Sequence, residues 1–352
     1  MTRTAPVPVV RDTNSETVLE VENLSCSIDT DDGPVKLVDN VSFAIRRGET
    51  LGVVGESGSG KTMLVRTIMG INPSAATVTG RVMLDGVDVL TLPKKERRRR
   101  LGAGIGMVFQ NPMTSLNPVV PVGRQITEGL RYHRRIGSRE ARARALELLG
   151  LVGISEPAAR LKQYPHQLSG GMRQRVMIAA ALACDPDVLI ADEATTALDV
   201  TVQKQILDLV KEIQTSRNMS AIIISHDLGV VAGRTDQLAV MYSSQVVETG
   251  PTAELFRHNR HQYTSALLRS IPDIEAEIHT KLATIPGSPR RNTRDVVGCR
   301  FAPRCRAATD KCHTTEPAPE FNEGSATHWY RCFWPTPLPD DSTGTPLAKA
   351  GR

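Results

Sequence analysis

The chain has 352 residues, of which 40% are hydrophobic, and its 43 basic and 38 acidic side chains give a formal net charge of +5. This length suits one large core with an appendage, or two modest domains. Aromatic residues make up only 4% of the chain, so a stacking platform for single-stranded nucleic acid is not expected. The longest apolar run, residues 176–184, is about half as long as a membrane-spanning helix.

The first sixteen residues are polar and rich in Pro and Thr, without the apolar middle segment of a secretory signal. We therefore expect residues 1–16 to be a disordered leader and the protein to stay in the cytoplasm. In that reducing compartment the six cysteines are expected to be free thiols or metal ligands, not disulfides.

Several short apolar runs predict a sheet. Residues 18–27 and 41–45 alternate apolar and polar side chains, as half-buried strands do. Residues 51–55 form a compact apolar strand that runs into a Gly/Ser loop, and residues 61–69 are expected to be the helix that follows. Residues 188–191 and 221–225 are apolar runs of strand length that suit a parallel sheet buried on both faces.

The rest of the chain has a different character. Residues 111–167 are predicted to be a helical insertion, with residues 139–149 rich in Ala, Arg, Leu and Glu. From about residue 251 the composition shifts toward Pro, Arg and Thr, and four of the six cysteines follow residue 298. The tail, residues 335–352, is predicted to be disordered.

A phosphate-binding motif lies between the predicted strand and helix. The motif G-x-x-x-x-G-K-[ST] is matched by Gly55, Glu56, Ser57, Gly58, Ser59, Gly60, Lys61 and Thr62. Its glycines let backbone N–H groups turn toward phosphates, its lysine reaches the terminal phosphates, and Thr62 is expected to bind Mg²⁺. Taken alone, the motif leaves an ordinary Gly-rich turn as the alternative.

Two adjacent carboxylates follow the apolar strand at residues 188–191. We expect Asp192 to hold the Mg²⁺ shell and Glu193 to polarise the attacking water. Because neighbours on a strand alternate in direction, the two carboxylates are expected to point different ways. The alternative is that the two residues are a solvated acidic pair at a strand end. The presence of the phosphate loop makes this alternative less favoured.

The segment Leu168-Ser169-Gly170-Gly171-Met172 is followed by Arg173-Gln174-Arg175 and an Ala-rich helix. With this segment the chain resembles the ATP-binding cassette family, whose signature sequence has this form and precedes the acidic strand. In that family the signature caps a nucleotide held by the opposite subunit, so the resemblance gives Ser169, Gly170 and Gly171 that role.

The resemblance extends to other positions between residues 18 and 250. It implies that Gln110 links Mg²⁺ and water to the helical subdomain, that Asp199 communicates across the dimer, and that His226 contacts the γ-phosphate. Lys61, Gln110, Glu193 and His226 are the implied catalytic residues. The implied fold is α/β: a RecA-like core with an antiparallel β subdomain and a helical insertion at about 111–167, together spanning residues 17–250, then a small C-terminal extension at residues 251–334.

The four late cysteines have the spacing C-x5-C-x6-C-x19-C. Residues 298–305 around the first two resemble the C-terminal region of oligopeptide/dipeptide transporter ATPases. Four thiolates can close a tetrahedral Zn²⁺ site or hold a [4Fe–4S] cluster. Sulfur-only ligation in irregular loops favours a structural cluster, with zinc and free thiols as alternatives, on Cys299, Cys305, Cys312 and Cys332. Cys26 and Cys184 are expected to be packing residues in a strand and a helix.

The resemblance also implies the protein's setting. It predicts an ATP- and Mg²⁺-dependent motor on the cytoplasmic face of the membrane, most simply for di- or oligopeptide import. Its partners would be a second and different cassette subunit, two permeases and an extracytoplasmic substrate-binding protein, without nucleic acid. Import of nickel, glutathione or another small solute is an alternative, as is a soluble ATPase acting on ribosomes or DNA.

Overall fold

The computed structural model describes residues 17–31, 33–193, 200–271, 284–288 and 297–337. The expected leader at residues 1–16, Asp199, and residues 338–352 of the expected tail lie outside this description.

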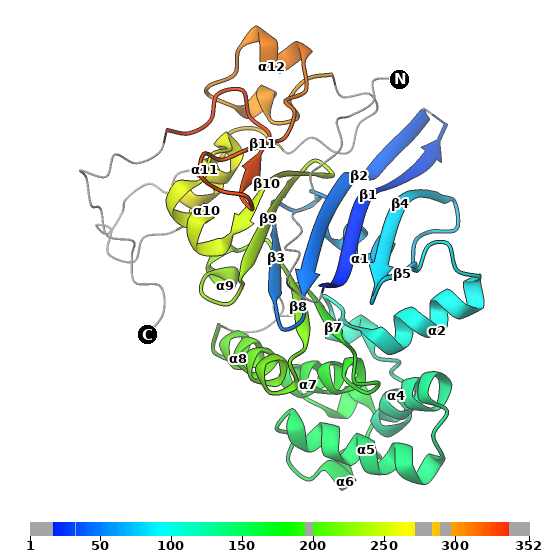
Figure 1. Ribbon diagram of the computed structural model, residues 1–352. Coiled ribbons are helices and arrows are strands. Elements are labelled where there is room, and N and C mark those ends of the chain that lie inside the picture. The colour runs from blue at the N-terminus through cyan, green and yellow to red at the C-terminus, as the bar shows by residue number, and fades with distance from the viewer. Residues whose placement is uncertain (1–16, 32, 194–199, 272–283, 289–296, 338–352) are drawn as a thin grey trace.

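An eight-stranded sheet forms the centre of the molecule (Figure 1), in the order β11-β12-β10-β9-β3-β8-β7-β6. The strands from β9 to β6 are parallel, and the side chains of β3, β7 and β8 are buried along their whole length. Burial on both faces explains why these segments are continuously apolar. The parallel strands are β3 (Thr50–Val54), β6 (Ile105–Val108), β7 (Val188–Asp192), β8 (Ser220–Ser225) and β9 (Gln237–Tyr242).

A second, antiparallel sheet has the strand order β2-β1-β4-β5. Its strands β4 and β5 are joined by Asp85 and Gly86, both at positive φ (46° and 71°), which suits the Asp-Gly turn of a tight hairpin. Helix α1 (Lys61–Ile68) shares one apolar core with both sheets. The strands are β1 (Thr17–Thr30), β2 (Gly33–Arg46), β4 (Ala76–Leu84) and β5 (Val87–Asp88).

Helices fill the region predicted as a helical insertion. Their apolar side chains, such as Ile126, Leu148 and Ile178, share one core with residues of β6, β7 and α8 (Val200–Arg217). After α2 (Lys94–Gly104) come α3 (Pro112–Ser115), α4 (Val122–Gly129), a π turn (Leu130–Arg134), α5 (Ser138–Leu151), α6 (Pro157–Arg160), a 3-10 turn (Pro165–Gln167) and α7 (Gly170–Ala181). Cys26 is buried in β1 as predicted, but Cys184 lies beyond the end of α7, so the expectation that it is helical was wrong.

The C-terminal extension continues the central sheet. Strand β12 (Trp329–Tyr330) pairs antiparallel with β10 (Gln245–Pro251), and β11 (Glu320–Phe321) pairs with β12. Between these elements lie α10 (Thr252–His258), α11 (Gln262–Arg269), a 3-10 turn (Ala302–Arg304) and α12 (Asp310–Thr314). Helices α8 (Val200–Arg217) and α9 (Leu228–Val231) complete the core domain.

A buried histidine fastens this sheet extension. The two ring nitrogens of His328 lie 2.8 Å from carboxylate oxygens of Glu248 on β10 and Glu254 on α10. Burial alone would lower the pKa of His328, but hydrogen bonds and charge from the two glutamates raise it overall. The two contacts of His328, the residue directly before β12, join this end of the extension to β10 and α10.

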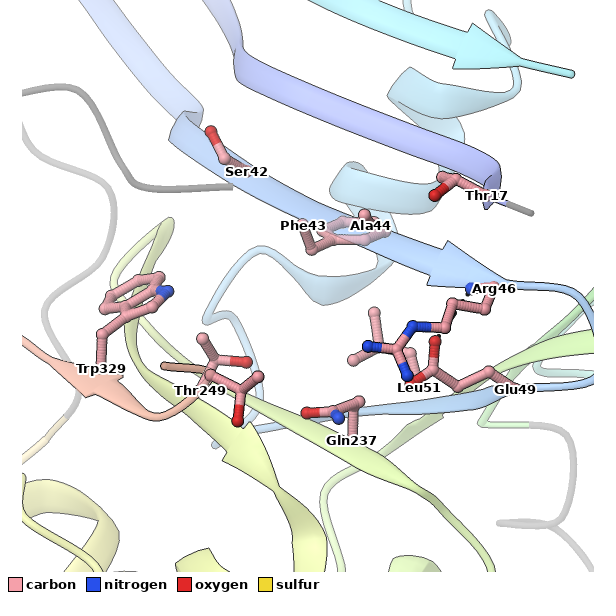
Figure 2. A pocket seen from close by; sticks show the side chains of 11 residues that line it. Thr17, Ser42, Phe43, Ala44, Arg46, Glu49, Leu51, Gln237, Thr249 and Trp329 are labelled. Atoms are coloured by element: carbon pink, nitrogen blue, oxygen red, sulfur yellow. Dashed lines mark hydrogen bonds between the residues drawn. The ribbon is translucent and has the colours of Figure 1, made fainter. Parts of the chain in front are cut away.

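A pocket marks where the extension meets both sheets (Figure 2). Phe43 of β2, Gln237 of β9 and Trp329 of β12 line it together. Glu49 also lines it, and burial raises the pKa of that carboxyl group. The described residues around it include none of the predicted nucleotide-site residues, so this pocket is separate from that site.

In the part of the chain that the structure describes, every helix is too short or too polar to cross a membrane.

Candidate nucleotide site

The phosphate loop connects buried β3 to α1. Gly55, Gly58 and Gly60 have φ values of +153°, +80° and +102°, a region that residues with a side chain rarely adopt. Gly60 is the N-cap of α1, and no side chain caps the helix there. The first N–H groups of α1 are therefore available to an anion such as a nucleotide phosphate.

Lys61 is held inside this loop. Its Nζ donates hydrogen bonds to the carbonyl oxygens of Gly55 (2.7 Å) and Glu56 (3.0 Å), and its side chain is 4% exposed. Burial lowers the pKa of Lys61, although the nearby carboxylates of Glu193 and Asp192 oppose the shift. The ammonium group thus sits in an environment that additional negative charge would stabilise.

Thr62 and Asp192 come together as the sequence predicted. The Thr62 hydroxyl donates to Asp192 Oδ1 at 3.1 Å, which joins the start of α1 to the end of β7. Burial raises the pKa of Asp192, while the hydrogen bond from Thr62 acts in the opposite direction. A hydroxyl and a carboxylate at one point fit the oxygen ligands that Mg²⁺ prefers.

Glu193 lies among three other side chains of the predicted site. Its carboxylate accepts a hydrogen bond from Gln110 Nε2 (2.7 Å), and lies 3.7 Å from Lys61 Nζ and 3.6 Å from His226 Nδ1. Glu193 follows the last residue of β7 and has a φ of +45°. The different directions of the two carboxylates therefore come from a left-handed residue after the strand. Alternation along the strand was the wrong explanation.

The predicted signature residues lie elsewhere, at the start of α7 (Figure 1). Ser169 is the N-cap of this helix, and its hydroxyl accepts a hydrogen bond from the N–H of Met172 (3.3 Å). Gly170 and Gly171 form the first turn. This chain does not place them in the group around Lys61, as expected for residues that act on a partner's nucleotide. Asp199 lies outside the described residues.

Several contacts to the phosphate loop were not predicted. Ser243 and Ser244, the turn between β9 and β10, both have positive φ (46° and 70°), and the Ser244 N–H donates to the Ser59 carbonyl at 2.8 Å. The Glu56 N–H donates to the Tyr263 hydroxyl (2.8 Å), and Arg304 pairs with the Glu56 carboxylate. No local sequence pattern indicates the pairing of Arg304 with Glu56, because the two residues are 248 positions apart.

The four late cysteines line one small cavity, together with Phe301 and Ala302. Burial raises the pKa of Cys299 to about 12 and that of Cys332 to about 11, and neighbouring cysteines add to both shifts. As the side chains stand in the described residues, no group of three or more His, Cys, Asp or Glu side chains is arranged to hold a metal ion. The four cysteines therefore lie around one cavity, and the cluster or zinc site expected from their spacing stays a prediction.

Comparison with known proteins decides the family. The chain is 47% identical to the oligopeptide transport ATP-binding protein AppD of Bacillus subtilis over 90% of its length and 96% of that protein. It is 46% identical to the dipeptide transport ATP-binding protein DppD of Escherichia coli over 86% of its length and 92% of that protein. The chain belongs to the ABC transporter family. The family model for ABC transporters matches residues 38–196, and a model for the oligopeptide/dipeptide transporter C-terminal region matches residues 247–312.

Solved ABC cassettes share the fold. A dimeric ATP-binding cassette in a post-hydrolysis state, bound to ADP and Pi, aligns with a TM-score of 0.60 and 27% identity over 66% of this chain and 98% of its own. The cassette cbiO1 of Clostridium perfringens aligns with a TM-score of 0.58 and 30% identity over 69% of this chain and 92% of its own. These findings confirm the predicted ABC family and the predicted RecA-like α/β fold. As a member of this family, the chain is an ATPase.

Proposed function

We propose that this ABC ATPase is the motor subunit of a membrane importer for di- or oligopeptides. The observation that carries this proposal is the C-terminal extension, which matches the oligopeptide/dipeptide transporter region and is built into the core sheet through β12. The relatives AppD and DppD, named for oligopeptide and dipeptide transport, are 47% and 46% identical to this chain across most of their length. We place the nucleotide-binding domain at residues 17–250 and the extension at residues 251–334.

In this proposal each residue of the site has a defined task. Lys61 and the N–H groups of residues 55–62 bind the ATP phosphates, and Glu193 accepts the proton of the attacking water. Thr62, Asp192 and Gln110 would hold Mg²⁺, which supplies positive charge beside the phosphates. The 3.1 Å contact between Thr62 and Asp192 and the 2.7 Å contact between Gln110 and Glu193 support this assignment. His226 contacts the γ-phosphate.

The site is completed by a second cassette subunit. We assign Ser169, Gly170, Gly171 and Asp199 to the contact between the two subunits, since the first three form the N-cap and first turn of α7 and, among the described residues, make no contact with the group around Lys61. ATP would favour the closed pair and hydrolysis would reopen it. We propose a non-identical partner cassette, two permeases and an extracytoplasmic substrate-binding protein, on the cytoplasmic face of the membrane.

Affinity purification of the tagged chain from detergent-solubilised membranes of its own host tests this proposal. We expect two multi-span permeases and a second cassette to co-purify, and peptide uptake to fail when the chain is deleted. Recovery with ribosomes or nucleic acid in the soluble fraction would overturn the transport role. A deletion strain that loses nickel or glutathione uptake while it retains peptide uptake would replace the substrate class.

We further propose that Cys299, Cys305, Cys312 and Cys332 hold a structural [4Fe–4S] cluster. Four sulfur atoms around one cavity with apolar walls fit the donor set of such a cluster, and the thiols would lose their protons on binding. Protein purified without oxygen is expected to be brown and to contain about four iron and four sulfide per chain. Zinc at one equivalent, or colourless protein free of metal, would contradict the cluster.

A further inference from the structure

Arg304 of the C-terminal extension forms an ion pair with Glu56 of the phosphate loop. The guanidinium of Arg304 donates to both carboxylate oxygens of Glu56, from Nη1 to Oε2 (2.6 Å) and from Nη2 to Oε1 (2.9 Å). Such a two-pronged pair fixes the carboxylate in both position and orientation. Glu56 is the residue directly after Gly55, so the contact falls on the first turn of the loop.

Residues of the extension and of β9 hold Arg304 in place. Its Nε donates to the Pro286 carbonyl at 2.8 Å, and its guanidinium lies 5.9 Å from the centre of the Tyr242 ring. The side chain is 5% exposed, and its pKa is raised further by the hydrogen bonds with Glu56. Arg304 ends the 3-10 turn between Cys299 and Cys305, so the fold of the cysteine-bearing segment decides where the guanidinium lies.

Glu56 links Arg304 to Lys61. Its carbonyl oxygen accepts a hydrogen bond from Lys61 Nζ (3.0 Å) and another from the Ser59 N–H (3.2 Å). Its own N–H is bound to the Tyr263 hydroxyl, on α11 of the extension. The side chain and the N–H of Glu56 are therefore both held by residues beyond position 251, while its carbonyl supports Lys61.

The charge of Glu56 makes the pairing important for ATP. A bare carboxylate on a loop that binds phosphates repels them, and the repulsion is stronger where water is excluded. In this structure the guanidinium neutralises that charge and turns the carboxylate toward the extension.

We propose that Arg304 is a positioning residue for ATP binding, which acts through Glu56 to hold the phosphate loop and to cancel its negative charge. The C-terminal extension is then a part of the nucleotide site, in addition to any role in transport or in binding a cluster.

The test is equilibrium titration of the purified full-length chain with a fluorescent, non-hydrolysable ATP analogue in the presence of Mg²⁺. Arg304→Met is expected to raise the Kd about tenfold, because it leaves a bare carboxylate on the loop. Arg304→Lys keeps the charge but not the two-pronged geometry, so its Kd is expected to lie in between. The double variant Glu56→Gln with Arg304→Met is expected to bind more tightly than Arg304→Met alone.

A matched control separates this role from general support of the fold. Arg331 is a buried arginine of the same extension that contacts the Pro317 carbonyl instead of the loop. Arg331→Met is expected to lower the melting temperature while the Kd stays within twofold of the unmodified chain. The proposal is overturned if Arg304→Met binds within twofold of the unmodified chain, or if the double variant binds no better than Arg304→Met. Should Arg304→Met fail to fold, Arg304→Lys replaces it in both comparisons. The proposal is then overturned if Arg304→Lys binds within twofold of the unmodified chain, or if Arg304→Lys combined with Glu56→Gln binds no better than Arg304→Lys alone.

Discussion

Glu193→Gln is expected to lower ATP turnover by about 10² to 10³-fold, since the amide cannot accept the proton of the attacking water. Gln has nearly the same shape as Glu, and its side-chain oxygen can still accept the hydrogen bond from Gln110 (2.7 Å in this structure). ATP binding should therefore persist, with a Kd within a few-fold of the unmodified chain. Steady-state phosphate release from the assembled transporter and equilibrium titration of nucleotide measure the two effects separately.

Glu49→Gln is the control for this prediction. Glu49 is a partly buried residue just before β3, and its carboxylate accepts a hydrogen bond from the Arg46 N–H. Its replacement removes a partly buried carboxyl group outside the phosphate site, so turnover should change little. If Glu193→Gln kept most of the ATPase activity, Glu193 would not be the general base.

Gly55→Ala is expected to abolish ATP binding and to destabilise the fold by about 3 kcal/mol. A Cβ atom at this position would lie 2.2 Å from the Met241 carbonyl oxygen and 2.9 Å from the Ser59 hydroxyl. The carbonyl belongs to β9 and cannot rotate away, so the phosphate loop would have to move instead. Thermal unfolding and nucleotide titration of the purified chain measure the two consequences.

Gly86→Ala provides the comparison for this loop substitution. Gly86 also has a positive φ (+71°), but a Cβ there would meet nothing within 4 Å. It should cost only the strain of a left-handed alanine, about 1 to 2 kcal/mol, and leave the ATP Kd unchanged. Equal effects from the two substitutions would mean that backbone strain, and not the clash with Met241, makes Gly55 necessary.

The elements that carry strong local patterns could be predicted from the sequence. The apolar run before Gly55 is β3, the run before Asp192 is β7, and the residues after Ser169 form α7. A buried parallel strand, and a helix that begins at a Ser N-cap, can each be recognised from the types of a few neighbouring residues in the sequence. The pairing of Thr62 with Asp192 also followed, because a phosphate loop and an acidic strand end belong to the same edge of a parallel sheet.

The missed features depend on contacts between distant residues. Arg304 and Glu56 are 248 positions apart, and no local pattern indicates which acidic residue an arginine will meet. The pairing of β12 with β10 involves strands of two and seven residues, and Trp329–Tyr330 alone is too short to predict as a strand. Ser243 and Ser244 adopt positive φ without glycine, because packing against the phosphate loop overrides their local preference.

The long separation between Glu56 and Arg304 has a consequence during protein synthesis. A ribosome adding about 5 to 20 residues per second needs about 12 to 50 s to travel from one residue to the other. Throughout that interval the nascent chain carries the phosphate loop without its arginine, and from Pro251 until Trp329 is added it also carries the outer edge of β10 without β12. Translation that stops between Pro251 and Arg304 therefore releases a cassette with every nucleotide-site motif, an unneutralised Glu56 and an open sheet edge able to pair with other chains.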